Sequence, residues 1–122
     1  MAHYMLRWKI SADSAKHFIA MPEDRTIAAR MLVEGFGGTL INYYFMLGEY
    51  DGVAIAEFED HVAVTACSLK AASTGAFSRF ETTALLTARE AEVAMRRAKG
   101  ARVNYKAPNG NGARPVRDLV RP

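Results

Sequence analysis

Residues 39–59, TLINYYFMLGEYDGVAIAEFE, contain two predicted strands and the short connection between them. Thr39–Leu47 and Val53–Glu59 are rich in β-branched and aromatic residues, which favour extended strands. The connection, Gly48–Gly52, ends in an Asp-Gly pair that tolerates the positive φ angles of a tight hairpin turn. The sequence therefore predicts that these two strands are antiparallel neighbours in a sheet.

Upstream of this hairpin, the sequence predicts one strand and two helices. His3–Ile10 alternates with the period of two that is typical of a strand, and Ala12–Ile19 has apolar residues at helical spacing. The first helix is expected to end before Pro22, which suits the first turn of a second helix whose positive end Glu23 and Asp24 complement. The apolar stripe of this second helix consists of Ile27, Ala28, Met31 and Leu32, and its terminating glycines are Gly35, Gly37 and Gly38.

Downstream of the hairpin, the sequence predicts a helix, a fourth strand and an additional helix. Asp60 is a favourable N-cap for the first of these helices, and Gly75 is expected to end it. Ala76–Leu86 has the composition of a strand, and a capping box at Thr87–Glu90 begins the last helix, which reaches about Lys99. The expected buried face of the helix after Asp60 is Val62, Ala63, Ala66 and Leu69.

The order of these elements predicts a ferredoxin-like βαββαβ fold of the α+β class. Its four-stranded antiparallel sheet carries both main helices on one face, and a further helix follows the last strand. The other face of the sheet is left without cover, and a large exposed apolar sheet face promotes aggregation. We therefore expect a second copy of the chain to cover it in at least a dimer. The sequence leaves open which alternating set of strand residues points to that face, and its apolar candidates are Tyr43, Phe45, Val53, Ile55, Phe77 and Leu85.

Length and charge indicate one globular domain followed by a basic tail. The chain has 122 residues, of which 50% are hydrophobic and 24% charged. Residues 1–100 are expected to form the domain, and residues 101–122, rich in Gly, Asn and Pro, a flexible tail. Met1–Met95 contains 8 basic and 12 acidic residues, whereas Arg96–Pro122 contains 8 basic and 1 acidic. The net charge of +3 therefore combines an acidic body with a basic tail, and a nucleic-acid partner is not expected.

The single cysteine and the absence of long apolar segments indicate a cytoplasmic protein. Cys67 has no second cysteine with which to form an intramolecular disulfide. No segment approaches the roughly 20 apolar residues that a membrane-spanning helix needs. The N-terminal residues lack a secretory signal pattern. We therefore expect no contact with a membrane.

The hairpin segment resembles the GYD-domain family. Leu47–Ile55 contains Gly48, Tyr50 and Asp51, with Glu49 interposed, and similar family residues match Pro22–Arg25, Gly37–Leu40 and Glu81–Leu85. The resemblance covers roughly Met5 to Leu86. It implies a dimeric α+β barrel of two ferredoxin-like sheets and a family largely without assigned activity. Proteins of that architecture include cofactor-free monooxygenases, muconolactone isomerase and haem-handling enzymes, an analogy at the level of fold alone.

Tyr50 and Asp51 allow two interpretations. They form either a polar site in which Asp51 orients a phenol or accepts a proton, or a structural turn in which Asp51 caps the backbone and Tyr50 packs. The favoured interpretation is structural, since turn chemistry accounts for Gly48, Asp51 and Gly52.

A second set of polar residues is expected to share one face of the sheet. Arg79 and Glu81 are two apart on the fourth strand, and Glu57 on the third strand is a candidate neighbour. With Asn42 and Tyr44, they line either a small-molecule pocket or a cross-strand ion pair at a dimer rim. The ion pair is favoured, because most ion pairs are structural.

No metal, cofactor or serine-nucleophile site is predicted. His3, His17 and His61 lack the spacing of a shared metal site, and Gly35–Gly38 follows a helix instead of preceding one, as a dinucleotide-binding loop must. No Gly-x-Ser-x-Gly motif occurs.

Three functions remain open. The favoured one is an oligomeric domain that binds a small molecule or serves in assembly. The alternatives are a cofactor-independent enzyme, similar to monooxygenases or isomerases, acting on a small aromatic or enolic substrate, and a weak binder of an anionic polymer through the basic tail.

Overall fold

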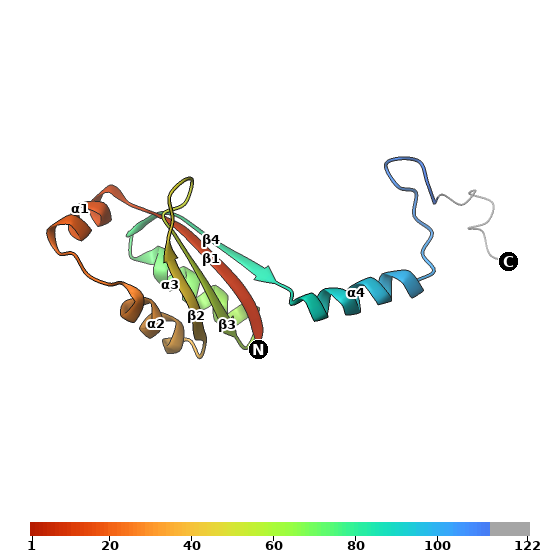
Figure 1. The fold of residues 1–122 in the computed structure, drawn as a ribbon, viewed down its shortest axis with the longest axis horizontal. Coiled ribbons are helices and arrows are strands. Elements are labelled where there is room, and N and C mark those ends of the chain that lie inside the picture. The colour runs from red at the N-terminus through yellow and green to blue at the C-terminus, as the bar shows by residue number, and fades with distance from the viewer. Residues whose placement is uncertain (113–122) are drawn as a thin grey trace. The chain divides into compact units, whose positions relative to one another are not determined.

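The computed structural model of the chain describes residues 1–112 (Figure 1). The chain divides into two compact units, Met1–Thr87 and Ala88–Pro122. The expected domain boundary after residue 100 stays a prediction. Part of the expected tail, including Arg114, Arg117 and Arg121, lies outside the described residues.

The ferredoxin-like α+β fold is confirmed. The elements follow the order β1 (Ala2–Ile10), α1 (Ala12–Ala20), α2 (Thr26–Gly35), β2 (Thr39–Phe45), β3 (Gly52–Phe58), α3 (His61–Ser73), β4 (Phe77–Leu85) and α4 (Ala88–Gly100). The strands form one antiparallel sheet in the order β2-β3-β1-β4. The expected strand pairing across the hairpin is therefore also observed, and β1 lies at the centre of the fold.

The core lies between the sheet and helices α2 and α3. The alternation in β1 buries Tyr4, Leu6 and Trp8, which pack in one cluster with Val33 of α2 and Cys67 of α3. Both main helices therefore cover the same face of the sheet, as Figure 1 also shows.

The opposite face, called here the helix-free face, carries the alternate residues of β1. In the β1 register His3 lies opposite Glu57 of β3 and Leu85 of β4, and Arg7 lies opposite Val53 and Glu81. Of the six apolar residues expected here, Val53, Ile55 and Leu85 take this face. The other three candidates, Tyr43, Phe45 and Phe77, pack on the helix side of the sheet.

Helix α2 begins later than expected. It starts at Thr26 and not at Pro22. The Asp24 carboxylate accepts a hydrogen bond from the Thr26 backbone N–H at 2.9 Å. This local turn offers the backbone an alternative to helical hydrogen bonds, so residues 22–25 form a connection. The hydrogen bonds from Thr26 also lower the pKa of Asp24.

The buried face of α3 differs from the expected one. Val64, Cys67 and Ala71 are buried, whereas Val62 and Leu69 are 76% and 65% exposed. The helix carries apolar residues on all sides, so its hydrophobic spacing does not select one face. The N-cap was predicted correctly, since the Asp60 carboxylate accepts from the Ala63 N–H at 2.9 Å.

Helix α4 belongs to the second unit and is described by itself. It extends through Gly100, one residue beyond the expected end, and Arg96 pairs with Glu92 one turn earlier at 3.4 Å. No helix among residues 1–112 is both long enough and apolar enough to cross a lipid bilayer.

Candidate functional site

A cavity of about 440 Å³ lies on the helix side of the sheet, within the first unit. Its walls come from all four strands and from helices α1, α2 and α3. Six aromatic rings line it, belonging to Trp8, Phe18, Tyr43, Phe45, Phe77 and Phe80.

The cavity owes its space to small side chains on β3. The helix-facing positions of this strand are Gly52, Ala54 and Ala56, followed by Phe58. Trp8 lies over Gly52 so closely that a Cβ atom at residue 52 would be 2.4 Å from the indole. Ala54 forms part of the cavity wall, where a larger side chain would fill the space.

The aromatic rings are arranged as parallel and tilted pairs. The Trp8 indole stacks with Tyr43 at 5.5 Å between centroids and with Phe80 at 6.0 Å. Phe45 continues the series, since its ring is 6.2 Å from Tyr43 and 6.1 Å from Phe18. These geometries are favourable for aromatic contacts. Such walls match a flat apolar compound.

The polar groups of the cavity come mainly from α1 and the α1–α2 connection. Asp13 and His17 of α1 line it, as does Arg25. The Arg25 guanidinium is 5.7 Å from the centroid of the Phe18 ring, and its Nη1 binds Glu23 at 2.7 Å. Burial raises the pKa of Tyr43, and the nearby Arg25 charge acts in the opposite direction. The Tyr43 phenol therefore keeps its proton.

The β2–β3 loop, Met46–Asp51, differs from the expected tight turn. The positive φ angle, 122°, belongs to Gly48, and neither Asp51 nor Gly52 has one. The Asp51 carboxylate instead accepts from the Ile10 N–H at 2.8 Å, and the Asp51 N–H donates to the Trp8 carbonyl at 2.7 Å. Asp51 thus ties the loop to the end of β1, while Gly52 makes room for Trp8.

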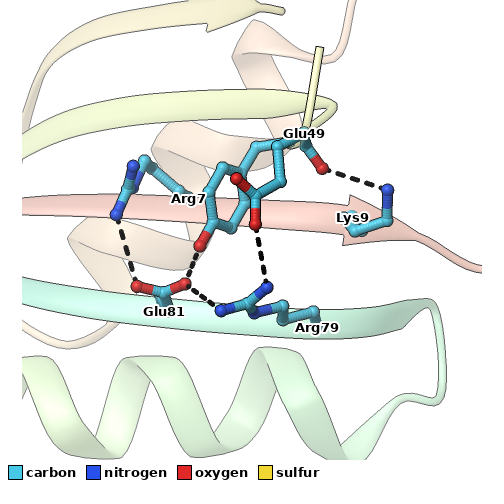
Figure 2. A network of polar contacts seen from close by, with 6 residues as sticks. Arg7, Lys9, Glu49, Arg79 and Glu81 are labelled. Atoms are coloured by element: carbon cyan, nitrogen blue, oxygen red, sulfur yellow. Dashed lines mark hydrogen bonds and ion pairs between the residues drawn. The ribbon is translucent and has the colours of Figure 1, made fainter.

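Tyr50 lies over the helix-free face and is 6% exposed. Its ring contacts two guanidinium groups, with the Cζ of Arg7 at 4.3 Å and that of Arg79 at 5.2 Å from the centroid. Its hydroxyl donates to Glu81, which also binds Arg7 at 3.3 Å and Arg79 at 3.0 Å (Figure 2). The carboxylate of Glu81 thus bridges the two guanidinium groups.

Two further contacts extend this network along the loop. Arg79 binds the Glu49 carboxylate at 3.3 Å, and the Lys9 ammonium donates to the Glu49 carbonyl at 3.0 Å, as Figure 2 shows. The loop therefore reaches across β1 to β4. Among the described residues, Arg7 Nε is the one buried side-chain nitrogen or oxygen without a hydrogen-bond partner.

The structure brings part of the predicted polar set together. Arg79 and Glu81 lie in the network with Tyr50, whereas Glu57 pairs with His3 at 3.0 Å, four residues along β1 from Arg7. Asn42 and Tyr44 of β2 share the helix-free face by register, but both are exposed and have no contact to the network.

Sequence reasoning missed the residues of the aromatic cavity. Two signals for it exist in the sequence. Aromatic residues recur on the helix side of β2 and β4, and helix α1 has an apolar stripe although none of its residues is buried. An apolar stripe that buries nothing indicates a helix over an open space.

The three histidines lie apart. His3 pairs with Glu57, His17 lines the cavity, and His61 Nδ1 is 2.6 Å from the Tyr4 hydroxyl. Within residues 1–112 no group of three His, Cys, Asp or Glu side chains is placed to hold a metal ion.

Comparisons with solved structures find similar structures at low sequence identity. The crystal structure of MtbAldR matches with a TM-score of 0.53 and 12% identity, over 70% of this chain and 53% of that chain. An uncharacterised NIPSNAP domain protein from Burkholderia xenovorans matches with a TM-score of 0.45 and 15% identity, over 72% of this chain and 95% of that chain. A hypothetical protein, PHS023, from Pyrococcus horikoshii matches with a TM-score of 0.44 and 15% identity, over 71% of this chain and 92% of that chain.

The sequence itself gives one match. A family model described as GYD domain covers residues 4–95, which include most of β1, all of β2, β3 and β4, and all the residues of the cavity and the network. A comparison with curated proteins gave no match.

Proposed function

The chain belongs to the GYD-domain family, and we propose that it is a small-molecule-binding domain whose ligand occupies the cavity between sheet and helices. The observation that supports this is the cavity's combination of volume and lining. At about 440 Å³ it falls within the roughly 300–1,000 Å³ of ligand pockets, and six aromatic rings surround it. A few polar groups, Asp13, His17 and Arg25, lie among apolar walls, as in ligand sites generally.

Close packing of protein interiors supports the same proposal. Interiors have few voids larger than a water molecule, because atoms around a void lose their dispersion contacts. Here Gly52, Ala54 and Ala56 keep the middle of β3 small on the side that faces the helices. A bound apolar compound would restore the missing contacts.

Binding is tested with a neutral aromatic probe, naphthalene methanol, by isothermal titration calorimetry. Ala29 of α2 lines the cavity, and Ala29→Leu would fill part of it, whereas Ala72→Leu adds the same volume at an exposed position of α3. We expect binding to the natural chain and to Ala72→Leu, and at least tenfold weaker binding to Ala29→Leu. Equal binding to both variants, or no binding at all, would contradict the proposal.

We propose in addition that two copies pair through their helix-free faces. Within the first unit this face is covered by the β2–β3 loop alone, and it exposes part of Met5, Val53, Ile55 and Leu85. The charges of the network are already paired with one another, so burial against a second sheet leaves few of them without a partner.

Dimerisation is tested by light scattering coupled to gel filtration. Ile55→Glu places a charge on the helix-free face, and Ile27→Glu places one on the exposed side of α2, where Ile27 is 64% exposed. We expect a dimer for the natural chain and for Ile27→Glu, and a monomer for Ile55→Glu. A monomeric natural chain at micromolar concentration overturns this part of the proposal.

A second candidate function is cofactor-independent catalysis in the same cavity. One observation favours it, since Asp13 and His17 lie four residues apart on α1 and both line the cavity. Such a pair is suited to moving a proton of an enolisable aromatic compound. The test is hydrogen–deuterium exchange of phenylacetone followed by NMR. Catalysed exchange that His17→Gln abolishes supports catalysis, and an uncatalysed rate with the natural chain argues against it.

The cytoplasm is the proposed location. Cys67 is a free buried thiol and the sequence has no second cysteine, which suits a reducing compartment.

A further inference from the structure

We propose that the ligand of the cavity is an aromatic carboxylate, and that Arg25 and Tyr43 together bind its carboxylate group. This inference rests on the proposed small-molecule binding and adds the chemical class of the ligand. The first support is the position of Arg25, which among residues 1–112 is the one arginine or lysine whose side chain lines the cavity.

Arg25 has N–H donors without a hydrogen-bond partner among the described residues. A guanidinium carries five N–H donors, and within the described residues Nη1 alone has a partner, the carboxylate of Glu23. Nε and Nη2 have none there. These two groups point in parallel from one edge of a guanidinium, which is the geometry that binds a carboxylate through two hydrogen bonds.

Tyr43 supplies a further donor on the wall of the same cavity. Its hydroxyl has no hydrogen-bond partner in the described part of the chain. Burial raises the pKa of this phenol, so it stays protonated and donates, and the Arg25 charge is close enough to act on it. A carboxylate placed between Arg25 and Tyr43 would satisfy both.

The acidic residues nearby do not cancel this preference. Glu23 is half exposed and its pair with Arg25 lies at the surface, where such pairs contribute little. The Asp24 charge also acts on the pKa of Tyr43, with a smaller effect than that of Arg25 and the opposite sign, and its carboxylate accepts a hydrogen bond from the Thr26 N–H. Asp13 lines the cavity but lies in the first turn of α1, where the positive end of the helix offsets its charge.

The aromatic part of the ligand has a defined place. The Tyr43 ring stacks on Trp8, which stacks on Phe80, so the rings lead from the proposed carboxylate site into the cavity. A compound with an aryl group one or two bonds from its carboxylate meets both features at once. Fatty acids fit the flat aromatic walls less well, and a neutral arene leaves the donors unused.

Three probes with the same ring test the inference by isothermal titration calorimetry on the full chain: naphthylacetate, naphthylacetamide and naphthylethylamine. We expect the acid to bind about tenfold or more tightly than the amide, as a charge-assisted hydrogen bond to arginine implies. Arg25→Gln and Tyr43→Phe should each reduce this ratio, because each weakens binding of the acid more than binding of the amide. Arg30→Gln, on the exposed side of α2, is the matched control and should keep the ratio. Glu23→Gln, which frees Nη1, should raise it.

The outcomes separate this inference from the proposed function. If the amide binds as tightly as the acid, or if Arg25→Gln keeps the ratio, the carboxylate assignment is wrong while small-molecule binding stands. If the amine binds most tightly, the assignment is also wrong and Asp13 becomes the recognising group. If none of the probes binds and the neutral alcohol does not bind either, the proposed function itself fails.

Discussion

Trp8 determines how much space remains above the centre of the sheet. Its indole lies across Gly52 and between the rings of Tyr43 and Phe80, which leaves the volume over Ala54 open. Gly52 is thus required by its neighbour on β1 and not by its own backbone angle. Gly52, the glycine of the Asp-Gly pair, is therefore needed to leave room for the Trp8 indole.

Gly52→Ala should therefore destabilise the domain. The new Cβ would be 2.4 Å from the indole, and overpacking of this kind costs about 1–3 kcal/mol. Urea unfolding followed by the fluorescence of Trp8, the one tryptophan of the sequence, measures both the stability and the displaced ring. Gly35→Ala, where nothing lies within 4 Å of the new Cβ, is the control and should keep its midpoint or gain slightly. Equal midpoints for the two variants would contradict the steric account.

Cys67 gives the stability a dependence on alkaline pH. The thiol is 1% exposed, and burial raises its pKa from 9.0 to about 11. Because the folded state holds this proton more tightly, the contribution of Cys67 to stability is complete below pH 9 and is lost as the pH rises through 11. The unfolding free energy of the natural chain should therefore fall more steeply between these pH values than that of Cys67→Ala, by up to about 2–3 kcal/mol.

The difference between the natural chain and Cys67→Ala isolates the contribution of the Cys67 thiol to the pH dependence of stability. Tyr43 also has a raised pKa and acts with the same sign, but it is present in both proteins. Urea unfolding at several pH values gives the two slopes. Parallel slopes would show that folding does not raise the pKa of the Cys67 thiol.

The sequence predicted residues whose roles are local. The alternation of β1 was sufficient to place Tyr4, Leu6 and Trp8 on one face, and Asp60 was identified as a cap from its position alone. Gly52 could not be interpreted in this way, since the atoms that require a glycine belong to β1. The same limit explains why Asp51 was assigned to the turn, although its acceptor role is toward Ile10.

At the scale of elements, α1 and α3 differ in how they are held. Helix α1 contains no buried residue, and its first turn is attached through Ser11 and Ser14, which both donate to the Ala76 carbonyl. Helix α3 buries Val64, Cys67 and Ala71 against the sheet. Helix α1 can therefore open by itself, whereas α3 opens with the domain.

Removing the two N-caps should separate these behaviours. Asp60→Ala removes the acceptor of the Ala63 N–H in α3 and should lower the global stability by about 1 kcal/mol. Ser11→Ala removes the acceptor of the Ser14 N–H in α1 and should speed amide exchange in α1, with a smaller shift of the urea midpoint. Hydrogen exchange by NMR and urea unfolding measure the two effects. Equal shifts of the midpoint would mean that α1 is part of the global unit.

The elements also show where sequence patterns were ambiguous. The strands were predicted correctly because an alternation of period two is typical of a strand and not of a helix. The predicted buried face of α3 was wrong because the helix is apolar on all sides. The predicted start of α2 was wrong because an aspartate that suits a helix terminus also suits a turn. Composition locates an element more reliably than it orients one.

At the scale of the whole first unit, the two faces of one sheet carry different chemistry. The helix side has the aromatic cavity, and the helix-free side has the network around Tyr50. The topology followed from the order of elements, because a hairpin between two βαβ halves has few arrangements. The order of elements does not predict which side chains meet in the network of Glu81, Tyr50, Arg7 and Arg79. That network depends on the strand register and on the path of a loop.

The reach of the β2–β3 loop has a consequence for the order of events in folding. Tyr50 and Glu81 are 31 residues apart in sequence, and their hydrogen bond requires the hairpin, β1 and β4 all to be in place. We therefore expect this contact to form after the transition state, and its loss to act on the unfolding rate. Stopped-flow kinetics of Tyr50→Phe should show faster unfolding, by about fivefold or more, and nearly unchanged refolding. Tyr44→Phe, an exposed position on the same face, should change neither rate. The contacts of the β2–β3 loop would then slow the unfolding of the sheet and leave its folding rate unchanged.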